Sequence, residues 1–267
     1  MKASINWLKE LVDLPAGRLG LKVSVEELVK LLPLRTIGLK EVTPDYIELD
    51  MKGYNRADLL SLRGAAYEIA AITDSKVKFT EEKDFIWQKN NLPKADVTVE
   101  DNNLAPLYCI AKIENLKVEQ SPETWKQKLN NSGIRTVNNV ADITNLIMVE
   151  YGQPMHAFDA AQVANETIIV RTAKNEEELV TLDGKARKLT TEDLLITDPQ
   201  KALGLAGVMG GKNSEVTNQT SSILLEAAIF DPQALRKTAT RLGLISEASK
   251  RFYHGLKADK ILMTTAG

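Results

Sequence analysis

The sequence NNVADITNLIMVEYGQPMHAFD, residues 138–159, carries the clearest local signal in the chain. Ile143, Ile147 and Tyr151 recur at the spacing of one face of an α-helix, with Val140 beside them. Gly152 follows directly and supplies the left-handed cap on which many helices end. The stretch therefore predicts a helix that packs through this apolar face and ends at Gly152.

One of the two histidines in the chain lies just after the predicted helix end. Pro154 prevents the helix from continuing, so His156 is expected in a polar loop between this proline and Phe158. Thr144 and Asn145 lie one step around the helix from the apolar face. The segment thus predicts a helix that leads directly to a candidate site residue.

Three roles are open for His156: a metal ligand, a general base or a structural histidine. Zinc needs three or four ligands, and Cys109 and His254 form no recognisable ligand motif with it, so no metal is expected. The chain lacks the nucleophile elbow of a serine hydrolase, and Asp159 is too close in sequence to be assumed an orienting partner. On the residues alone, a lone histidine is more often structural, although its loop position favours function.

The composition indicates a globular protein of two domains. The 267 residues exceed the usual size of one domain, and 43% hydrophobic with 26% charged residues is typical of globular chains. No apolar run approaches the roughly 20 residues that cross a bilayer, and the start lacks the apolar region of a signal peptide. The single cysteine excludes an intrachain disulfide. We expect a cytoplasmic protein with no membrane partner.

The order of predicted elements divides the chain into two parts, and the fold class expected is α+β. Residues 1–80 predict a small α+β domain, with one helix capped by Ser4 and a second opened by a capping box at residues 24–27 and closed by Pro33. Residues 81–95 lack periodicity and predict a linker, in which Trp87 is expected to dock on a neighbour. Residues 96–267 predict a larger mixed α/β domain.

Capping and turn residues mark the elements of the larger part. The prediction comprises a long buried strand at 107–118, a helix capped by Ser121, a hairpin with an Asp183-Gly184 turn, a buried strand at 222–229, and helices capped by Asp231 and Ser246.

A glycine-rich segment, GLAGVMGGKN at residues 204–213, invites comparison with phosphate-binding loops. Those loops require a strand, a glycine turn and then a helix, with Ser or Thr after the P-loop lysine. Here Asn213 takes that place and a polar loop is predicted to follow, so nucleotide binding is not expected. Two interpretations stay open: a turn with bare backbone that a ligand or strand approaches closely, or a bulge that only shapes the sheet.

Glu226 interrupts the otherwise apolar strand ILLEAAI at residues 223–229. A carboxylate in a buried strand must be paired or hydrogen-bonded. Either the strand is at a sheet edge with Glu226 facing water, or Glu226 lies in a pocket and binds a ligand donor.

Basic residues are concentrated near the end of the chain, although the net charge of the whole chain is −2. A solvated basic face and a contact with a phosphate backbone explain this pattern equally well. The residues are Arg236, Lys237, Arg241, Lys250, Arg251, His254, Lys257 and Lys260.

Several motifs, in order, resemble one known family. NNVADITN at 138–145 with GQPMHAFD at 152–159 resembles the signature of the B3/B4 domain of bacterial phenylalanyl-tRNA synthetase beta subunits. The same pattern continues with LAGVMGG at 205–211, LLE at 224–226 and RF at 251–252. INWLKE at 5–10 and NRADLLS at 55–61 resemble the first domain of these subunits, called B1. The resemblance covers nearly the whole chain, with residues 1–80 similar to B1 and residues 96–267 similar to B3/B4.

The resemblance implies an editing activity, the hydrolysis of tyrosine mischarged onto tRNA(Phe). A pocket shaped for phenylalanine cannot strongly reject a ligand that only adds a hydroxyl, so a second site must bind that hydroxyl. Glu226 would accept its hydrogen bond, and a positioned water, helped by the terminal ribose hydroxyl, would attack the ester. The implied catalytic residues are His156, Asn145 and Thr144, which would orient the ester and the water. The implied substrate-binding residues are Arg135, Ala206, Gly207, Glu226, Ser246 and Ala248.

The chain departs from the family pattern in several places. The segment from Leu32 to Val42 is too short to contain the OB-fold that most bacterial members insert. Ala57 replaces a usual proline and Ser246 a common threonine. Tyr253 and His254 replace a usual Glu-Arg pair, which weakens any inherited role in basic contacts.

The chain is also far shorter than a full beta subunit and has neither the aminoacylation site nor its ATP motifs. We therefore expect an N-terminal fragment that needs no cofactor itself, from a synthetase that uses ATP and Mg and pairs with an alpha subunit. Two alternatives remain: a non-catalytic scaffold or tRNA-contact module with a decayed pocket, and a free-standing trans-editing deacylase.

Overall fold

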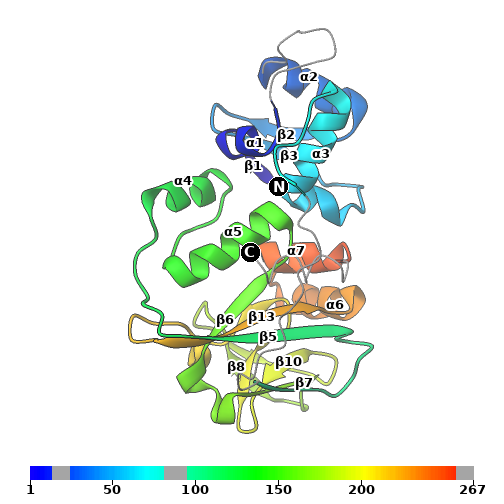
Figure 1. The fold of residues 1–267 in the computed structure, drawn as a ribbon. Helices are drawn as coiled ribbons and strands as arrows, with labels where there is room; N and C mark the ends of the chain where they lie inside the picture. Colours follow the sequence, from blue (N-terminus) through cyan, green and yellow to red (C-terminus); the bar gives the residue numbers. More distant parts are fainter. Residues whose placement is uncertain (14–24, 81–94, 257–267) are drawn as a thin grey trace.

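The computed structural model describes residues 1–13, 25–80 and 95–256 (Figure 1). A small group of helices and strands from the N-terminal residues lies at one end of the molecule, and the remaining strands lie at the other. The helices α5 (Asn139–Tyr151) and α7 (Glu247–Tyr253) lie between the two groups. None of the helices in these ranges combines the length and apolarity needed to cross a bilayer.

The N-terminal part is a three-stranded antiparallel sheet, in the order β1-β3-β2, packed against helices. Its elements are β1 (Lys2–Ser4), α1 (Ile5–Leu11), α2 (Val25–Arg35), β2 (Leu39–Val42), β3 (Tyr46–Leu49), η1 (Ala57–Leu60) and α3 (Leu62–Thr73). Its buried core joins side chains of all three helices to the sheet, among them Trp7, Leu28, Ile47 and Leu62.

The capping and proline signals in the N-terminal part predicted some helix ends correctly and others wrongly. Ser4 caps α1, because its Oγ accepts a hydrogen bond from the Trp7 N–H, as predicted. Pro33 does not close α2, which continues to Arg35. Proline itself cannot donate, but the N–H groups of Thr36 and Ile37 both bond the Leu32 carbonyl and close the last turn. The predicted capping box includes Ser24, which lies outside the described residues.

The described residues of the larger part form three sheets, one of them the two-stranded pair β8-β9, and four α-helices, so the predicted α+β class is confirmed. A five-stranded sheet has the order β12-β11-β10-β7-β4, with β4 parallel to β7, and a three-stranded antiparallel sheet has the order β5-β13-β6. The strands are β4 (Asp96–Val99), β5 (Leu107–Glu114), β6 (Met155–Asp159), β7 (Thr167–Thr172), β8 (Glu178–Val180), β9 (Ala186–Lys188), β10 (Leu194–Thr197), β11 (Ala202–Leu205), β12 (Met209–Gly210) and β13 (Ser222–Ile229). The other helices are α4 (Glu123–Asn131), α6 (Pro232–Leu242) and the short turns η2 (Ala160–Gln162), η3 (Ala164–Glu166) and η4 (Lys212–Ser214).

The helix α5 ends where the sequence predicts, but its buried face is shifted from the predicted one. Gly152 is the left-handed cap, with φ of 87°. On the predicted apolar face Val140 is buried but Ile143 is 42% exposed, whereas Thr144 and Met148 next to that face are buried. The helical period was correct, and the buried face is shifted toward Thr144 and Met148, where α5 has β6, α4 and α3 as neighbours.

Two other local predictions in the larger part were wrong. The strand β5 ends at Glu114, not at residue 118, and its side chains are half-buried or exposed. Ser121 does not cap α4, whose N-cap is Pro122. The Ser121 hydroxyl instead donates to the buried carboxylate of Asp142 at 2.5 Å. A buried carboxylate needs such donors and therefore competes successfully with the helix end.

Side chains at the end of α5 fasten the N-terminal part to the larger one. Glu150 accepts hydrogen bonds from Arg63 Nε at 3.0 Å and from Trp7 Nε1 at 3.2 Å. The Arg63 guanidinium also lies 3.7 Å from the centre of the Tyr151 ring. The linker at 81–95 and the docking of Trp87 fall, apart from residue 95, outside the described residues, so the domain bounds of 1–80 and 96–267 stay predictions.

Candidate active site

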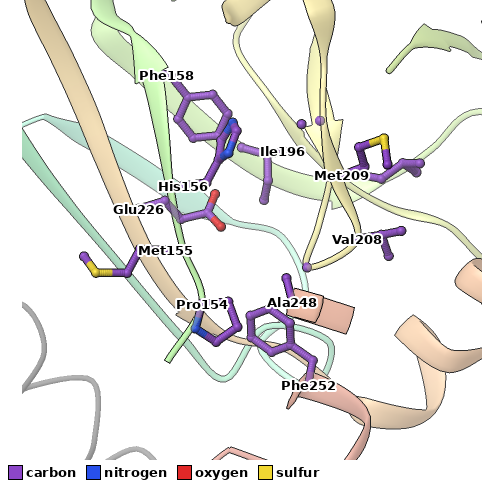
Figure 2. A pocket seen from close by; sticks show the side chains of 14 residues that line it. Pro154, Met155, His156, Phe158, Ile196, Val208, Met209, Glu226, Ala248 and Phe252 are labelled. Carbon is purple, nitrogen blue, oxygen red and sulfur yellow. The ribbon is translucent and has the colours of Figure 1, made fainter. Parts of the chain in front are cut away.

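A cavity of about 80 Å³ lies where the strands β6 and β13 face the glycine-rich turn and the start of α7 (Figure 2). Figure 2 shows the Glu226 carboxyl and the His156 imidazole coming from neighbouring strands, with Ala248 and Phe252 across from them. The lining residues are Pro154, Met155, His156, Phe158, Ile196, Gly204, Leu205, Gly207, Val208, Met209, Gly210, Glu226, Ala248 and Phe252.

Glu226 lies on the central strand of its sheet, not on an edge. The strand β13 pairs with β5 on one side and with β6 on the other, which places Glu226 opposite Ile110 and opposite His156. Directly opposed residues on antiparallel strands point to the same face of the sheet. Glu226 is 7% exposed, so the interpretation in which it faces water is wrong, and its carboxyl forms part of the cavity wall.

The Glu226 carboxyl has a neighbour that binds it directly. The Tyr108 hydroxyl donates a hydrogen bond to Glu226 Oε2 at 2.7 Å. Burial raises the pKa of Glu226 to about 7, and the Tyr108 hydrogen bond opposes part of that increase. Burial, followed by the nearby Glu226 charge, raises the pKa of Tyr108 well above its usual value. Glu226 therefore changes charge near neutral pH, while Tyr108 stays a neutral donor.

His156 lies on β6 rather than in the predicted loop. Residues after Pro154 extend at once because they pair with β13, a partner about 70 residues away in sequence that local signals do not reveal. Its Nε2 is buried without a hydrogen-bond partner in the described parts of the chain. The ring packs edge-on against Phe158, with centroids 4.6 Å apart. Burial lowers the pKa of His156 to about 4, so the imidazole is neutral at pH 7.

The glycine-rich segment forms a strand, a turn and a second strand. Gly204 on β11 pairs with Gly210 on β12, and Gly207 in the turn has φ of 62°. A Cβ at Gly207 would lie 2.7 Å from Leu235 Cδ1, so only glycine fits there. The segment lacks a strand, turn and helix order and forms no phosphate cradle, whereas the close-approach interpretation agrees with these contacts.

Replacing Gly210 by alanine is expected to displace the His156 ring. The new Cβ would lie 2.5 Å from His156 Cε1 and 2.7 Å from Nε2, closer than van der Waals contact allows. We expect shifted NMR signals of the His156 imidazole and a free energy of unfolding lower by about 1–3 kcal/mol. Gly38→Ala is the control, because its Cβ would meet Asp50 Cβ at an ordinary 3.7 Å. Unmoved His156 signals in Gly210→Ala would contradict this contact.

The structure brings together four of the nine predicted site residues in the cavity wall, namely His156, Gly207, Glu226 and Ala248. Two more flank it. Ala206 is buried beside Gly207, and the Ser246 hydroxyl donates to the Val208 carbonyl at 3.0 Å while it caps α7. Ser246 thus ties the glycine-rich turn to α7.

The other three predicted site residues do not line the cavity. The Thr144 hydroxyl donates to the Ala141 carbonyl within α5, at 2.8 Å. Asn145 is half-buried on the same helix, and Arg135 is exposed between α4 and α5. Any contact of these three with a ligand would therefore involve a part of it that lies outside the cavity.

Sequence reasoning missed Tyr108 and most of the apolar wall. One signal for Tyr108 was available, because a tyrosine in an apolar strand needs a partner for its hydroxyl when buried. The identity of that partner depends on the register of β5 against β13, which the sequence does not display.

The basic residues near the end of the chain do not form one solvated face. Arg251 is 1% exposed and pairs with Glu247 at 3.0 Å, and Arg241 pairs with the buried Asp193. Lys257 and Lys260 lie outside the described residues. In the described ranges, no group of three or more His, Cys, Asp or Glu could hold a metal ion.

Comparisons with known proteins agree with the motifs. The model of the B3/4 domain family matches residues 104–265. The phenylalanine–tRNA ligase beta subunit of Streptococcus thermophilus is 42% identical over 222 residues, which is 83% of this chain and 27% of that protein. The corresponding subunit of Staphylococcus haemolyticus is 42% identical over 205 residues, 77% of this chain and 26% of that protein.

A solved structure also aligns. It is an N-terminal fragment of the phenylalanyl-tRNA synthetase beta subunit from Pyrococcus horikoshii, with 20% identity and a TM-score of 0.41, over 93% of this chain and 73% of that chain. The chain spans about a quarter of the length of the curated relatives it matches. The predicted resemblance to the beta subunit is confirmed, and the chain belongs to the B3/4 domain family.

Proposed function

We propose that this chain carries an editing site that hydrolyses the ester of tyrosine mischarged onto tRNA(Phe). In a full-length cytoplasmic subunit, it would work beside an aminoacylation centre that is formed with an alpha subunit and uses ATP and Mg. One observation carries the proposal: a single buried carboxyl, Glu226, stands in the wall of a small cavity and has one oxygen already hydrogen-bonded.

Glu226 gives the cavity a means of telling tyrosine from phenylalanine. The phenol of a tyrosyl substrate would donate a hydrogen bond to the carboxyl. A phenylalanyl side chain would leave the second oxygen of the desolvated carboxyl without a donor, at a cost of about 1–3 kcal/mol. A hydrophobic aminoacylation pocket cannot strongly reject a substrate that only adds a hydroxyl. A site built to bind that hydroxyl can select the substrate that carries it.

The size and walls of the cavity suit one aromatic ring. Its volume of about 80 Å³ is well below the range of roughly 300–1,000 Å³ typical of whole drug-sized ligands. Ile196, Val208 and Phe252 supply apolar walls, and the bare backbone of Gly207 allows close approach. The side chain of an aminoacyl group would enter, and the tRNA would stay outside.

His156 is suited to orient the ester or a water molecule. A neutral imidazole has one donor and one acceptor nitrogen, and Nε2 has no partner within the described ranges. A neutral histidine in the wall accepts or donates without adding a charge near Glu226. Three other residues do not line the cavity that would hold the amino acid side chain, namely Thr144, Asn145 and Arg135. In the proposal they would contact the ester or the end of the tRNA, which lie outside that cavity.

Hydrolysis of Tyr-tRNA(Phe) and Phe-tRNA(Phe) by this chain tests the proposal. We expect preferential hydrolysis of the tyrosyl ester, and a rate lower by about 10- to 100-fold in His156→Ala because the ester or water is then misplaced. His254→Ala is the matched control, since that imidazole bonds the Lys250 carbonyl and does not line the cavity.

Two outcomes would contradict the editing proposal. Binding of tRNA without hydrolysis of either ester would favour a scaffold or tRNA-contact module. Equal rates for both esters would remove the role of Glu226 in substrate choice.

A further inference from the structure

Tyr108 lies behind Glu226 rather than in the cavity wall. We propose that Tyr108 is a specificity-determining positioning residue, whose hydroxyl holds one oxygen of Glu226 so that the other oxygen receives the hydroxyl of a tyrosyl substrate. This inference rests on the proposed editing function and names a residue that the implied site does not contain.

The strand register brings the two side chains together. Tyr108 pairs with Ala228 and Ile110 pairs with Glu226, so Tyr108 and Glu226 are diagonal neighbours on one face of the sheet. Long aromatic side chains reach such diagonal neighbours. The distance from Tyr108 Oη to Glu226 Oε2 is 2.7 Å. The contact therefore follows from the pairing of β5 with β13.

Aromatic packing holds the phenol in place. The Tyr108 ring lies 6.4 Å from the Phe230 ring, and Phe230 lies 5.2 Å from Phe252, which lines the cavity. These tilted pairs fix ring orientation. A movement of Tyr108 away from Glu226 would give up its contact with Phe230, which packs against the wall residue Phe252.

The hydrogen bond leaves a defined acceptor for the substrate. A phenol has one O–H to donate, and Tyr108 uses it on Oε2. Glu226 Oε1 has no hydrogen-bond partner among residues 1–13, 25–80 and 95–256. A substrate phenol would thus occupy a second, equivalent position on the same carboxylate.

Burial has the largest effect on the pKa of Glu226, and the hydrogen bond from Tyr108 opposes it. The strand β5 presents Tyr108 and the apolar Ile110, and β6 presents His156, which is neutral at pH 7. The helix α7 presents Ala248 and Phe252, and the glycine-rich segment presents backbone and apolar side chains such as Val208, so neither adds a charge. The hydrogen bond from Tyr108 favours the ionised carboxyl, against the effect of burial. Because a carboxylate accepts hydrogen bonds more strongly than a neutral carboxyl, tyrosine selectivity should rise with pH through the pKa of Glu226.

Tyr108→Phe tests the inference, with Tyr253→Phe as the matched control. Both variants remove one phenol oxygen from a tyrosine packed against the same core, and Tyr253 Oη is buried without a partner in the described residues. The measurement is the ratio of kcat/KM for Tyr-tRNA(Phe) to that for Phe-tRNA(Phe) against pH, after subtraction of the uncatalysed rates. In Tyr108→Phe we expect a midpoint about one pH unit higher and a ratio about 10-fold lower at pH 7. Tyr253→Phe should match the wild-type chain.

A second readout does not depend on hydrolysis. The carboxyl stretch of Glu226 can be followed by infrared titration and assigned by its absence in Glu226→Gln. Tyr108→Phe should shift that titration to higher pH, which a general loss of packing would not do.

An unchanged midpoint and ratio in Tyr108→Phe would overturn the inference and leave the editing function standing. Equal hydrolysis of both esters by the wild-type chain would overturn the editing function. The infrared titration would then decide by itself whether Tyr108 controls Glu226.

Discussion

Glu226→Ala is expected to abolish the preference for the tyrosyl ester. Among the described residues, Glu226 is the one acidic side chain that lines the cavity, so the hydroxyl of tyrosine would enter the variant without that acceptor. A hydrogen bond to a charged group contributes about 1.5–3 kcal/mol, so the ratio of kcat/KM for Tyr-tRNA(Phe) over Phe-tRNA(Phe) should fall by about 10- to 100-fold. The fall should come from both esters: the tyrosyl ester loses its acceptor and is hydrolysed more slowly, and the phenylalanyl ester no longer leaves a desolvated carboxyl oxygen without a donor and is hydrolysed faster.

Glu114→Ala provides the matched control for that experiment. Glu114 lies at the end of β5 in the same sheet, and its side chain is 59% exposed in an ion pair with Lys112. Its removal should leave the ratio unchanged. Circular dichroism of both variants verifies folding. A folded Glu226→Ala protein that still prefers the tyrosyl ester would exclude Glu226 as the group that binds the hydroxyl.

Glu226→Gln is expected to stabilise the chain at alkaline pH. In the folded chain the pKa of Glu226 is about 7, whereas the ordinary value for a glutamate is 4.5. Between these values the folded state binds more protons than the unfolded state, so the stability of the wild-type chain declines as pH rises from 4.5 to 7. Glutamine does not ionise. The variant should therefore gain on the order of 2–3 kcal/mol relative to the wild type at pH 8, with little gain below pH 4.5.

Urea unfolding of both proteins at pH 4.5 and pH 8 measures this difference. His156 has the opposite sign: burial lowers its pKa, so its contribution to stability is lost as pH falls from 6.5 toward about 4. The two effects partly cancel in the wild-type chain, which is why the comparison with Glu226→Gln is needed. A stability difference that does not change with pH would contradict the raised pKa of Glu226.

Both expected results concern Glu226. Its carboxylate lowers the free energy of unfolding at alkaline pH and would let the cavity prefer the tyrosyl over the phenylalanyl ester. A buried carboxyl with one free oxygen is unfavourable in the empty cavity and favourable once a donor arrives. Functional sites commonly contain such unfavourable groups. Tyr108 reduces the penalty without using the second oxygen, so both properties coexist in the same cavity.

The sequence by itself determined the fold class and many, though not all, of the local elements. Ser4, Asp231 and Ser246 cap the helices that they were predicted to cap, and Gly152 ends α5. The strand at 222–229 has the predicted bounds, and Asp183-Gly184 joins the strands of a hairpin. These features follow from the chemistry of a few neighbouring residues, because caps, turns and positive φ angles act over one turn of chain. The order of the motifs also indicated the family, and the resemblance to that family implied site roles for Glu226 and His156.

The tertiary structure alone decided how those residues meet. It placed His156 on a strand, shifted the buried face of α5 toward Thr144, and set Glu226 between Tyr108 and His156. Tyr108 and Glu226 are 118 residues apart in sequence, and their contact depends on the register of β5 and β13. A shift of one residue in that register would move every side chain to the opposite face of the sheet. Register is fixed by the packing of the whole sheet against its core, and no local segment of the sequence contains that information.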